Sequence, residues 1–340
     1  MKVAIIGCGS IGQRHARNLL DLGIRDLLLV DQQRELARSV AFALGARSVA
    51  TATEAYSQSP EVAMVCAPTS YHIPLAWEAL NANCHLFIEK PLSHSMKGAE
   101  ELVSAAQAQN RLVLVGYNFR FDPILIRVAQ WLAIGSIGHI TSARFDFGSY
   151  LPGRHPGEDY RAGYGARREL GGGVVLDASH ELDMALWLFG WPEEIHAIGG
   201  KYSDLETDVE DLTEILLGYG DKIVSIHLDY IARPAERRFE VIGTEGRIKA
   251  DLFLRQARRF DVRENQWVEY ESCGSIEETY KHEVRHLLDC IAGKSKPIIG
   301  GNSAIETLLL TERVKQSIRF GSPMCFGKSQ SFGSLVAAEK

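Results

Sequence analysis

The first 120 residues alternate between short apolar runs and segments with helical spacing, and this alternation limits the possible folds more than any other feature. The apolar runs are rich in Val, Ile and Leu, which is typical of strands buried on both faces of a parallel sheet. They are VAIIG, DLLLVD, VAMVCAP, HLFIEK and RLVLVGY. The repeated order of strand and helix predicts an α/β domain built on a doubly wound parallel sheet.

The pattern changes after Phe121. Strand signals follow one another without intervening helices from about 193 to 270, and such strands pair antiparallel. Helices are expected at 123–134, 174–190, 277–292 and 302–319, a strand at 139–147 and a long Gly- and Arg-rich loop at 149–173. We therefore divide the chain into a first domain, a second α/β domain and a Gly/Ser-rich tail that we expect to be mobile, with bounds 1–121, 122–325 and 326–340.

Composition excludes several classes of protein. The 340 residues include 37 Lys and Arg against 43 Asp and Glu, so a net charge of −6 gives no reason to expect nucleic acid or an anionic membrane as a partner. The six cysteines form no C-x-x-C pair and are expected to be reduced core thiols, and we assign no metal ligands. The apolar run at Val3–Ile6 is too short for a signal-peptide core, and no stretch could span a bilayer. We expect a cytoplasmic protein.

The segment GCGSIG places Gly7, Gly9 and Gly12 in the G-x-G-x-x-G spacing. It follows an apolar strand and opens a helix at Ser10 and Ile11, which is the context that gives this spacing meaning. The helix N-terminus then offers free amide donors and a positive dipole end to a diphosphate. These five residues are predicted to bind a dinucleotide, and the alternative is an ordinary glycine-rich turn.

Asp31 ends the second apolar run, 19 residues after Gly12. A carboxylate there can accept hydrogen bonds from ribose hydroxyls and repels a 2′-phosphate, so it favours NAD over NADP. Arg34 weakens this preference, because a guanidinium could bind that phosphate. The alternative role of Asp31 is to cap the next helix.

Two further segments lie at the carboxyl ends of predicted strands, where ligands of such sheets bind. In APTSYH, the candidates for cofactor contact are Ala67, Pro68, Thr69 and His72. Thr69 could instead cap the following helix, and His72 could be a surface histidine. In FIEKPLSHS, the candidates for cofactor contact are Glu89 and Lys90, which directly follow an apolar run, and Pro91 fixes the turn after them.

Taken together, these motifs resemble the glucose–fructose oxidoreductase, inositol dehydrogenase and MocA-type family, abbreviated Gfo/Idh/MocA. The resemblance extends over nearly the whole chain and includes GYNFRF at 116–121 and GGGVVLDASHELD at 171–183. It implies a Rossmann domain and an α+β domain with an open, largely antiparallel sheet that binds substrate and forms a homodimer or homotetramer. It also implies that Lys90 points into the active site, where a cation stabilises the oxyanion formed during oxidation.

The resemblance assigns the general base to His180. In a straight helix Asp177, His180 and Glu181 share one face, and relatives place an aspartate one turn before this histidine. Here the sequence departs from the family, because Asp177 precedes His180 by three positions instead of four. We therefore leave open whether Asp177 or Glu181 supports the base. The alternatives are a structural histidine and, for Asp177, a helix-capping role.

The same resemblance places Asn118 beside the cofactor and Arg120 beside the substrate, although the arginine is often structural. The loop DYRAGYGARREL supplies aromatic rings and guanidinium groups that suit a polyhydroxylated or anionic substrate. Its candidates for substrate binding are Tyr160, Arg161, Tyr164 and Arg167, followed by Arg168. The loop could instead contact another subunit.

These features predict an NAD(P)-dependent dehydrogenase that oxidises a secondary alcohol of a sugar, a cyclitol or a sugar derivative, including nucleotide-sugars and sugar acids. Two other functions stay open. Some relatives cleave glycosides through a transient oxidation without net NADH formation. Others sense a dinucleotide without catalysis, but these would lack the lysine or the histidine.

Overall fold

The computed structural model describes residues 1–154 and 157–325, so the tail expected at 326–340 lies outside the described residues. The N-terminal part contains a six-stranded sheet in which every pairing is parallel. The strand order is β3-β2-β1-β4-β5-β6. These strands are β1 (Lys2–Ile6), β2 (Asp26–Val30), β3 (Arg47–Ser48), β4 (Val62–Val65), β5 (His85–Glu89) and β6 (Val113–Gly116). The order reverses between β1 and β4, which confirms the predicted doubly wound sheet.

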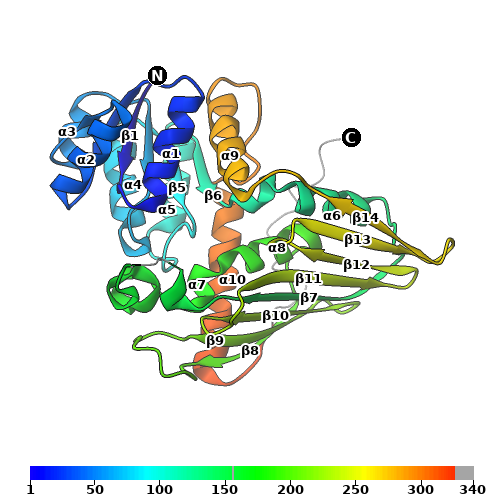
Figure 1. Ribbon diagram of the computed structural model, residues 1–340. Coiled ribbons are helices and arrows are strands. Elements are labelled where there is room, and N and C mark those ends of the chain that lie inside the picture. Colours follow the sequence, from blue (N-terminus) through cyan, green and yellow to red (C-terminus); the bar gives the residue numbers. More distant parts are fainter. Residues whose placement is uncertain (155–156, 326–340) are drawn as a thin grey trace.

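Helices cover both faces of this first sheet (Figure 1). They are α1 (Ser10–Asp21), α2 (Arg34–Leu44), α3 (Ala52–Ser57), α4 (His72–Asn81) and α5 (Ala99–Ala108). Apart from the short, exposed edge strand β3, the strands between them are buried almost throughout, as their apolar sequences predict. Because β1, β4 and β5 are neighbours and run parallel, their carboxyl ends meet at one edge of the sheet. Gly7, Ala67 and Lys90 follow the strands at this edge.

The second sheet has nine strands in the order β14-β13-β12-β11-β7-β10-β9-β8-β15. Its pairings are antiparallel except for the parallel pair of β7 and β10. The strands are β7 (Ile140–Gly148), β8 (Glu194–Gly200), β9 (Leu212–Gly218), β10 (Ile223–Asp229), β11 (Glu236–Gly243), β12 (Gly246–Asp251), β13 (Gln256–Asp261), β14 (Gln266–Glu271) and β15 (Met324–Cys325). This confirms the expected open, largely antiparallel sheet.

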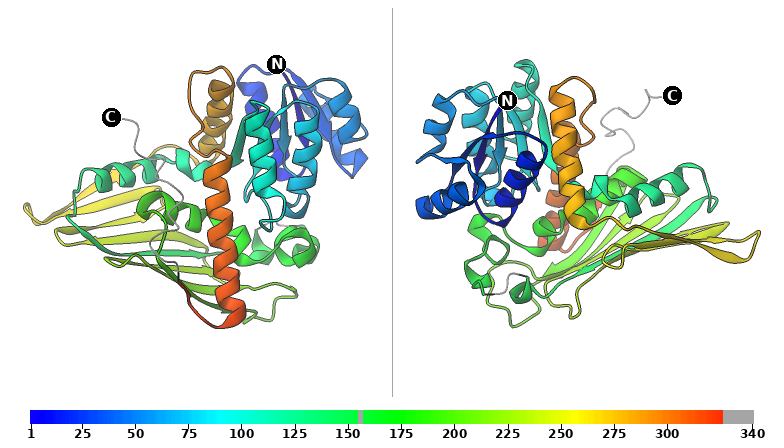
Figure 2. Two further views of the ribbon diagram at one scale, coloured as in Figure 1. Left: turned by 180° about the vertical axis from the view of Figure 1, so that it is seen from behind. Right: turned by 45° about the horizontal axis from the view of Figure 1, so that its top comes forward.

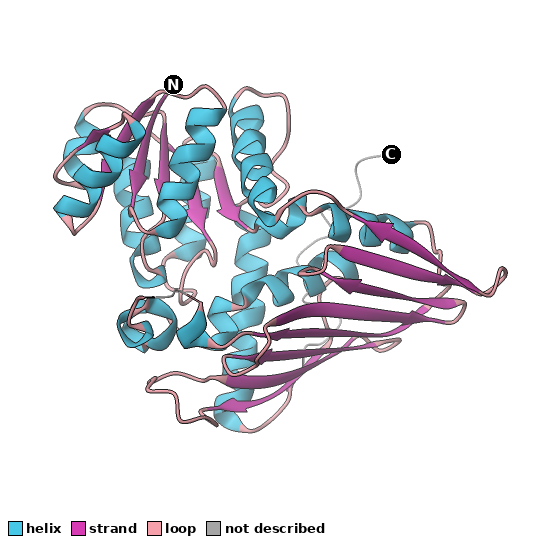
Figure 3. Ribbon diagram, viewed as in Figure 1, coloured by secondary structure: helices cyan, strands magenta, loops and turns pink. Residues whose placement is uncertain are grey.

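Helices α6 (Pro123–Ala133) and α8 (Ser179–Phe189) lie on one face of the second sheet (Figure 3). Inward side chains of the strands alternate with outward ones, as a sheet covered on one face requires. The inward set includes Ile215 and Ile226, which are fully buried in one core with Leu182 of α8. On the outward face Leu216 and Ile223 are exposed.

The last two helices connect the two sheets (Figure 2). Helix α9 (Ile276–Ile291) packs on α1, and its Val284 and Leu287 join the core of the first sheet. Helix α10 (Gly301–Phe320) begins beside β6 and ends beside β8. The division at residues 121 and 122 stays a prediction, and residues 276–308 contribute to the first core although they follow the second sheet in sequence.

Two expectations need correction. The predicted helix 174–190 is broken into two helices, α7 (Val174–Asp177) and α8, which begins at Ser179. The residue between them is Ala178, whose ψ of 30° departs from helical geometry. The cysteines are all unpaired as expected, but Cys273 and Cys325 are exposed and are not core thiols. Among the described residues no helix combines the length and apolarity needed to cross a membrane.

Candidate active site

The glycine turn between β1 and α1 has the shape that a diphosphate requires. Gly7 has a φ of +104°, and a Cβ on Gly12 would lie 1.9 Å from the carbonyl oxygen of Gly7, so both positions need glycine. A Cβ on Gly9 would meet nothing within 4 Å, and no side chain caps the start of α1. Open space at Gly9 and uncapped amides at Ser10 and Ile11 fit the phosphates of a dinucleotide.

These contrasting environments predict opposite effects for two alanine substitutions. Gly9→Ala should leave the melting temperature without cofactor unchanged but raise the Kd for NAD about tenfold or more, because the methyl group enters the phosphate space. Gly12→Ala should instead lower stability by about 1–3 kcal/mol through overpacking. Calorimetry and NAD titration of both variants check this. A wild-type Kd for Gly9→Ala would contradict the assignment of this space to a diphosphate.

Asp31 lies beside this turn but does not cap α2, because the capping position belongs to Gln33. Its carboxylate accepts hydrogen bonds from the backbone N–H of Cys8 at 2.7 Å and of Gln33 at 2.8 Å. These bonds fix the carboxylate at the end of β2, next to the glycine turn. That position suits contact with a ribose, while the exposed Arg34 stands at the start of α2.

The segment after β4 is held in place by His72. The ring of His72 is buried, with Nδ1 2.9 Å from the carbonyl oxygen of Pro91 and Nε2 2.8 Å from that of Ala67. His72 therefore ties together the turns after β4 and β5, and it does not lie on the surface. Thr69 is buried and caps no helix through its side chain, and Pro68 next to it is exposed.

Glu89 belongs to a buried cluster behind the turn that carries Lys90. Its Oε1 lies 2.6 Å from Nε2 of His15, and its Oε2 accepts from the backbone N–H of Lys90 at 3.1 Å. Glu283 of α9 lies close by, and burial together with the charge of Glu89 raises the pKa of Glu283 well above its ordinary value. Glu89 thus orients the Lys90 backbone and links β5 to α1, beside the predicted cofactor site.

Lys90 and Asp177 meet across the boundary between the two sheets, although 87 positions separate them in sequence. Nζ of Lys90 donates to the carbonyl oxygen of Asp177 at 2.8 Å and approaches Oδ1 of the same residue at 3.4 Å. The Lys90–Pro91 peptide bond is cis. The sequence motifs place both residues in one site, and the structure brings them into contact.

The carboxylate of Asp177 is the centre of a hydrogen-bond network. It accepts from the hydroxyl of Tyr164 at 2.5 Å, from the hydroxyl of Tyr230 at 3.1 Å, and from the guanidinium of Arg154. Burial alone would raise the pKa of Asp177, but the charges of Arg154 and Lys90 outweigh burial and lower it below the ordinary range. Asp177 is therefore ionised and holds the ammonium group of Lys90 in place.

His180 lies beside this network and is uncharged at neutral pH. Burial, followed by the positive charges of Lys90 and Arg237, lowers the pKa of His180 well below its ordinary value. Its ring lies 4.5 Å from the ring of Phe119, and Nδ1 is buried with no hydrogen-bond partner among the described residues. A neutral imidazole with a free nitrogen can accept a proton, as a general base must.

Arg154 and Arg237 belong to this cluster although the sequence motifs did not identify them. Arg154 follows a short turn of the long loop, where nothing local distinguishes it from other surface arginines. The sequence of β11 did contain a signal for Arg237. Arg237 lies two and four positions before the buried Phe239 and Val241, and residues two apart in a strand share a face, so Arg237 lies on the inward face. Its Nε lies 2.8 Å from Oε1 of Glu181. Glu181 therefore pairs with Arg237, and Asp177 is the carboxylate that contacts Lys90.

Several other candidates have structural partners. Arg120 forms an ion pair with Asp183 at 2.7 Å and stacks on Trp187, and Asn118 donates to the hydroxyl of Thr279 at 2.7 Å. Both side chains fasten the segment after β6 to neighbouring helices. The aspartate of the H-x-x-D pattern, Asp183, also has a structural partner, because it is the residue that pairs with Arg120.

The exposed arginines of the long loop are neutralised by acidic neighbours. Arg161 pairs with Asp159 and Glu206, and Arg167 pairs with Glu169. The guanidinium of Arg168 donates to the backbone carbonyl oxygen of Asp208, and its backbone N–H donates to the Asp208 carboxylate. The hydroxyl of Tyr160 accepts from the backbone N–H of Glu206. Of the four loop residues predicted to bind substrate, the structure brings only Tyr164 to the site.

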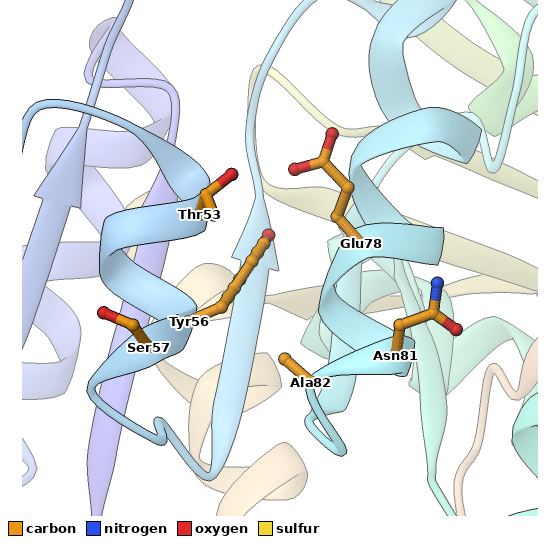
Figure 4. Close-up of a pocket in the computed structure, with 6 residues that line it drawn as sticks. All are labelled: Thr53, Tyr56, Ser57, Glu78, Asn81 and Ala82. Atoms are coloured by element: carbon orange, nitrogen blue, oxygen red, sulfur yellow. The ribbon is translucent and has the colours of Figure 1, made fainter.

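A shallow depression between α3 and α4 lies apart from this site (Figure 4). Its lining residues are Thr53, Tyr56, Ser57, Glu78, Asn81 and Ala82. No charged partner converges there on Glu78, and α3 stands on the side of the first sheet away from the second sheet (Figure 1). The depression carries no chemistry comparable with the cluster at Lys90.

The fold and the glycine turn define an NAD-binding oxidoreductase, and comparison with known families agrees. Residues 1–117 match the family described as an oxidoreductase family with an NAD-binding Rossmann fold, and residues 125–249 match the GFO/IDH/MocA C-terminal domain. Together the two matches cover more than two thirds of the chain. The chain belongs to the GFO/IDH/MocA family of NAD-dependent oxidoreductases, which confirms the resemblance seen in the sequence.

Individual relatives are distant. Myo-inositol 2-dehydrogenase of Thermotoga maritima is 25% identical over 346 residues, covering 94% of this chain and 96% of the relative. Levoglucosan dehydrogenase in complex with NADH and levoglucosan superposes with a TM-score of 0.86 at 18% identity, covering 96% and 99% of the two chains. The WlbA dehydrogenase of Bordetella pertussis, in complex with NADH and UDP-GlcNAcA, gives 0.82 at 20% identity, covering 96% of this chain and 99% of that chain. At these identities the two structures show that the fold is shared.

Proposed function

We propose that this protein is an NAD-dependent dehydrogenase that oxidises a secondary alcohol of a sugar, a cyclitol or a sugar derivative. The observation that carries this proposal is the contact of Lys90 Nζ with Asp177, which places an ammonium group beside the uncharged His180. The relatives include an inositol dehydrogenase and a levoglucosan dehydrogenase, which supports a carbohydrate-like substrate.

The residues present fit the cofactor and divide the chemistry between them. Gly9, Ser10 and Ile11 would hold the diphosphate of NAD, and Asp31 would bind a ribose. When bound, NAD supplies the hydride acceptor. His180 accepts the proton of the reacting hydroxyl, because burial and two neighbouring cations keep its imidazole neutral.

Lys90 stabilises the negative charge that develops on the reacting oxygen. An ammonium group has three N–H donors, and two of those on Lys90 Nζ point to the carbonyl oxygen and the carboxylate of Asp177. One donor is left for the substrate. Asp177 fixes the ammonium in position, since its own carboxylate is held by Arg154, Tyr164 and Tyr230. Preorganised charge of this kind is commonly the largest single contribution to catalysis.

The test is a screen of polyols, aldoses, uronates and aryl glycosides with NAD, following both NADH absorbance and release of aglycone. We expect NADH to form in proportion to substrate consumed, with no aglycone released. Release of aglycone without net NADH would instead identify a redox-neutral glycoside hydrolase. Tight NAD binding without turnover of any compound would favour a dinucleotide-sensing protein.

A further inference from the structure

Cations outnumber carboxylates in the cluster around His180. Lys90, Arg154 and Arg237 have side chains that are 17%, 18% and 12% exposed. The acids that pair with them are Asp177 and Glu181, so one positive charge is in excess when His180 is neutral. A low-dielectric environment strengthens the field of such an excess charge.

Arg154, Arg237 and His180 lie around two aromatic rings that they share as neighbours. The guanidinium of Arg237 lies 4.6 Å from the ring centroid of Phe119 and 4.0 Å from that of Phe147. Arg154 lies 5.4 Å from the same Phe147 ring, and His180 lies 4.5 Å from the Phe119 ring. Arg237 therefore contacts two rings and stands between the second guanidinium and the base.

Arg237 differs from the other two cations in what it binds. Lys90 and Arg154 donate hydrogen bonds to Asp177, and Arg154 also donates to Ser149. Arg237 pairs with Glu181 through Nε at 2.8 Å, and its two terminal nitrogens have no hydrogen-bond partner among the described residues. Glu181 is only 1% exposed. The terminal nitrogens of Arg237 can therefore donate to a ligand while Nε stays with Glu181.

We propose that Arg237 determines substrate specificity by binding a carboxylate or phosphate group of the sugar, beside the hydroxyl that His180 deprotonates. This inference rests on the proposed function. A guanidinium binds either anion through two parallel hydrogen bonds, and its planar shape suits a slot between two rings. The enzyme thus selects sugar acids or sugar phosphates over neutral sugars.

The experiment compares substrates that differ only in their charge. Glucose, glucuronate and glucose 6-phosphate are tested with the full chain and saturating NAD. Comparing glucuronate with glucose 6-phosphate shows whether the site prefers a carboxylate or a phosphate. Thermal stabilisation by each compound is measured beside turnover, so that a failure of the dehydrogenase reaction leaves the anion site testable. We expect one of the anions to raise the melting temperature, and its kcat/KM to exceed that of glucose by about 10–100-fold.

Arg237→Met should abolish this preference, whereas Arg247→Met should retain it. Arg247 is a matched control, since it lies on the adjacent β12 and is exposed in a surface pair with Glu240. If Arg237→Met does not fold, Glu181→Gln combined with Arg237→Met removes both partners of the buried pair, and Arg237→Lys keeps the charge without the fork. The proposal is overturned if neither anion stabilises the protein more than glucose, or if the preference survives loss of the guanidinium.

Discussion

Replacing Lys90 with methionine is expected to lower kcat by about 10²–10³-fold while the Kd for NAD stays unchanged. Methionine keeps most of the side-chain length but removes the charge that stabilises the developing oxyanion. The carboxylate of Asp177 keeps Arg154, Tyr164 and Tyr230 as partners, so the variant should fold. Initial rates of NADH formation and a titration with NADH measure the two quantities.

Lys249→Met is the matched control for this variant. Lys249 lies on β12, and its ammonium group is exposed and lies 3.7 Å from Glu240. Its replacement should leave both kcat and the Kd for NAD at wild-type values. Near-normal turnover by Lys90→Met would refute the role of the ammonium group, whereas a weakened Kd would place Lys90 in cofactor binding instead.

Local sequence signals identified most of the first domain and the central pair of the site. Short apolar runs and the glycine spacing predicted the parallel sheet, because each strand and turn is determined by neighbours in sequence. Lys90 and His180 were found through motifs in which a chemical group has a fixed place after a strand or on a helix. The contact of Lys90 with Asp177 between the two sheets could not be predicted locally, since no local pattern encodes a contact between residues 90 and 177, and the family resemblance was needed to place both in one site.

The remaining site residues depend on tertiary contacts. The break at Ala178 could not be predicted from helical periodicity, which continues through it, and it changes the relation of Asp177 to His180. Arg154 and Arg161 belong to the same loop, but one enters the site while the other pairs on the surface. Which arginine turns inward depends on Asp177 and Tyr230, both distant in sequence.

Replacing His180 with asparagine is expected to lower kcat by about 10²–10⁴-fold and to change the pH profile. A general base acts only when it is unprotonated. Burial, Lys90 and Arg237 lower the pKa of His180 well below its ordinary value, so the wild-type kcat/KM should stay constant as the pH falls through that ordinary value. The decline should begin only at a lower pH, where the imidazole becomes charged.

The pH profile separates this role from a structural one. The amide side chain of His180→Asn cannot gain a proton, so the acid decline should disappear from the residual rate, whereas a merely structural loss would lower the rate and keep the wild-type profile. Lys90→Met supplies an internal check, because removing one of the two cations that lower the pKa should move the decline to higher pH. An unchanged acid limb in both variants would mean that another group accepts the proton.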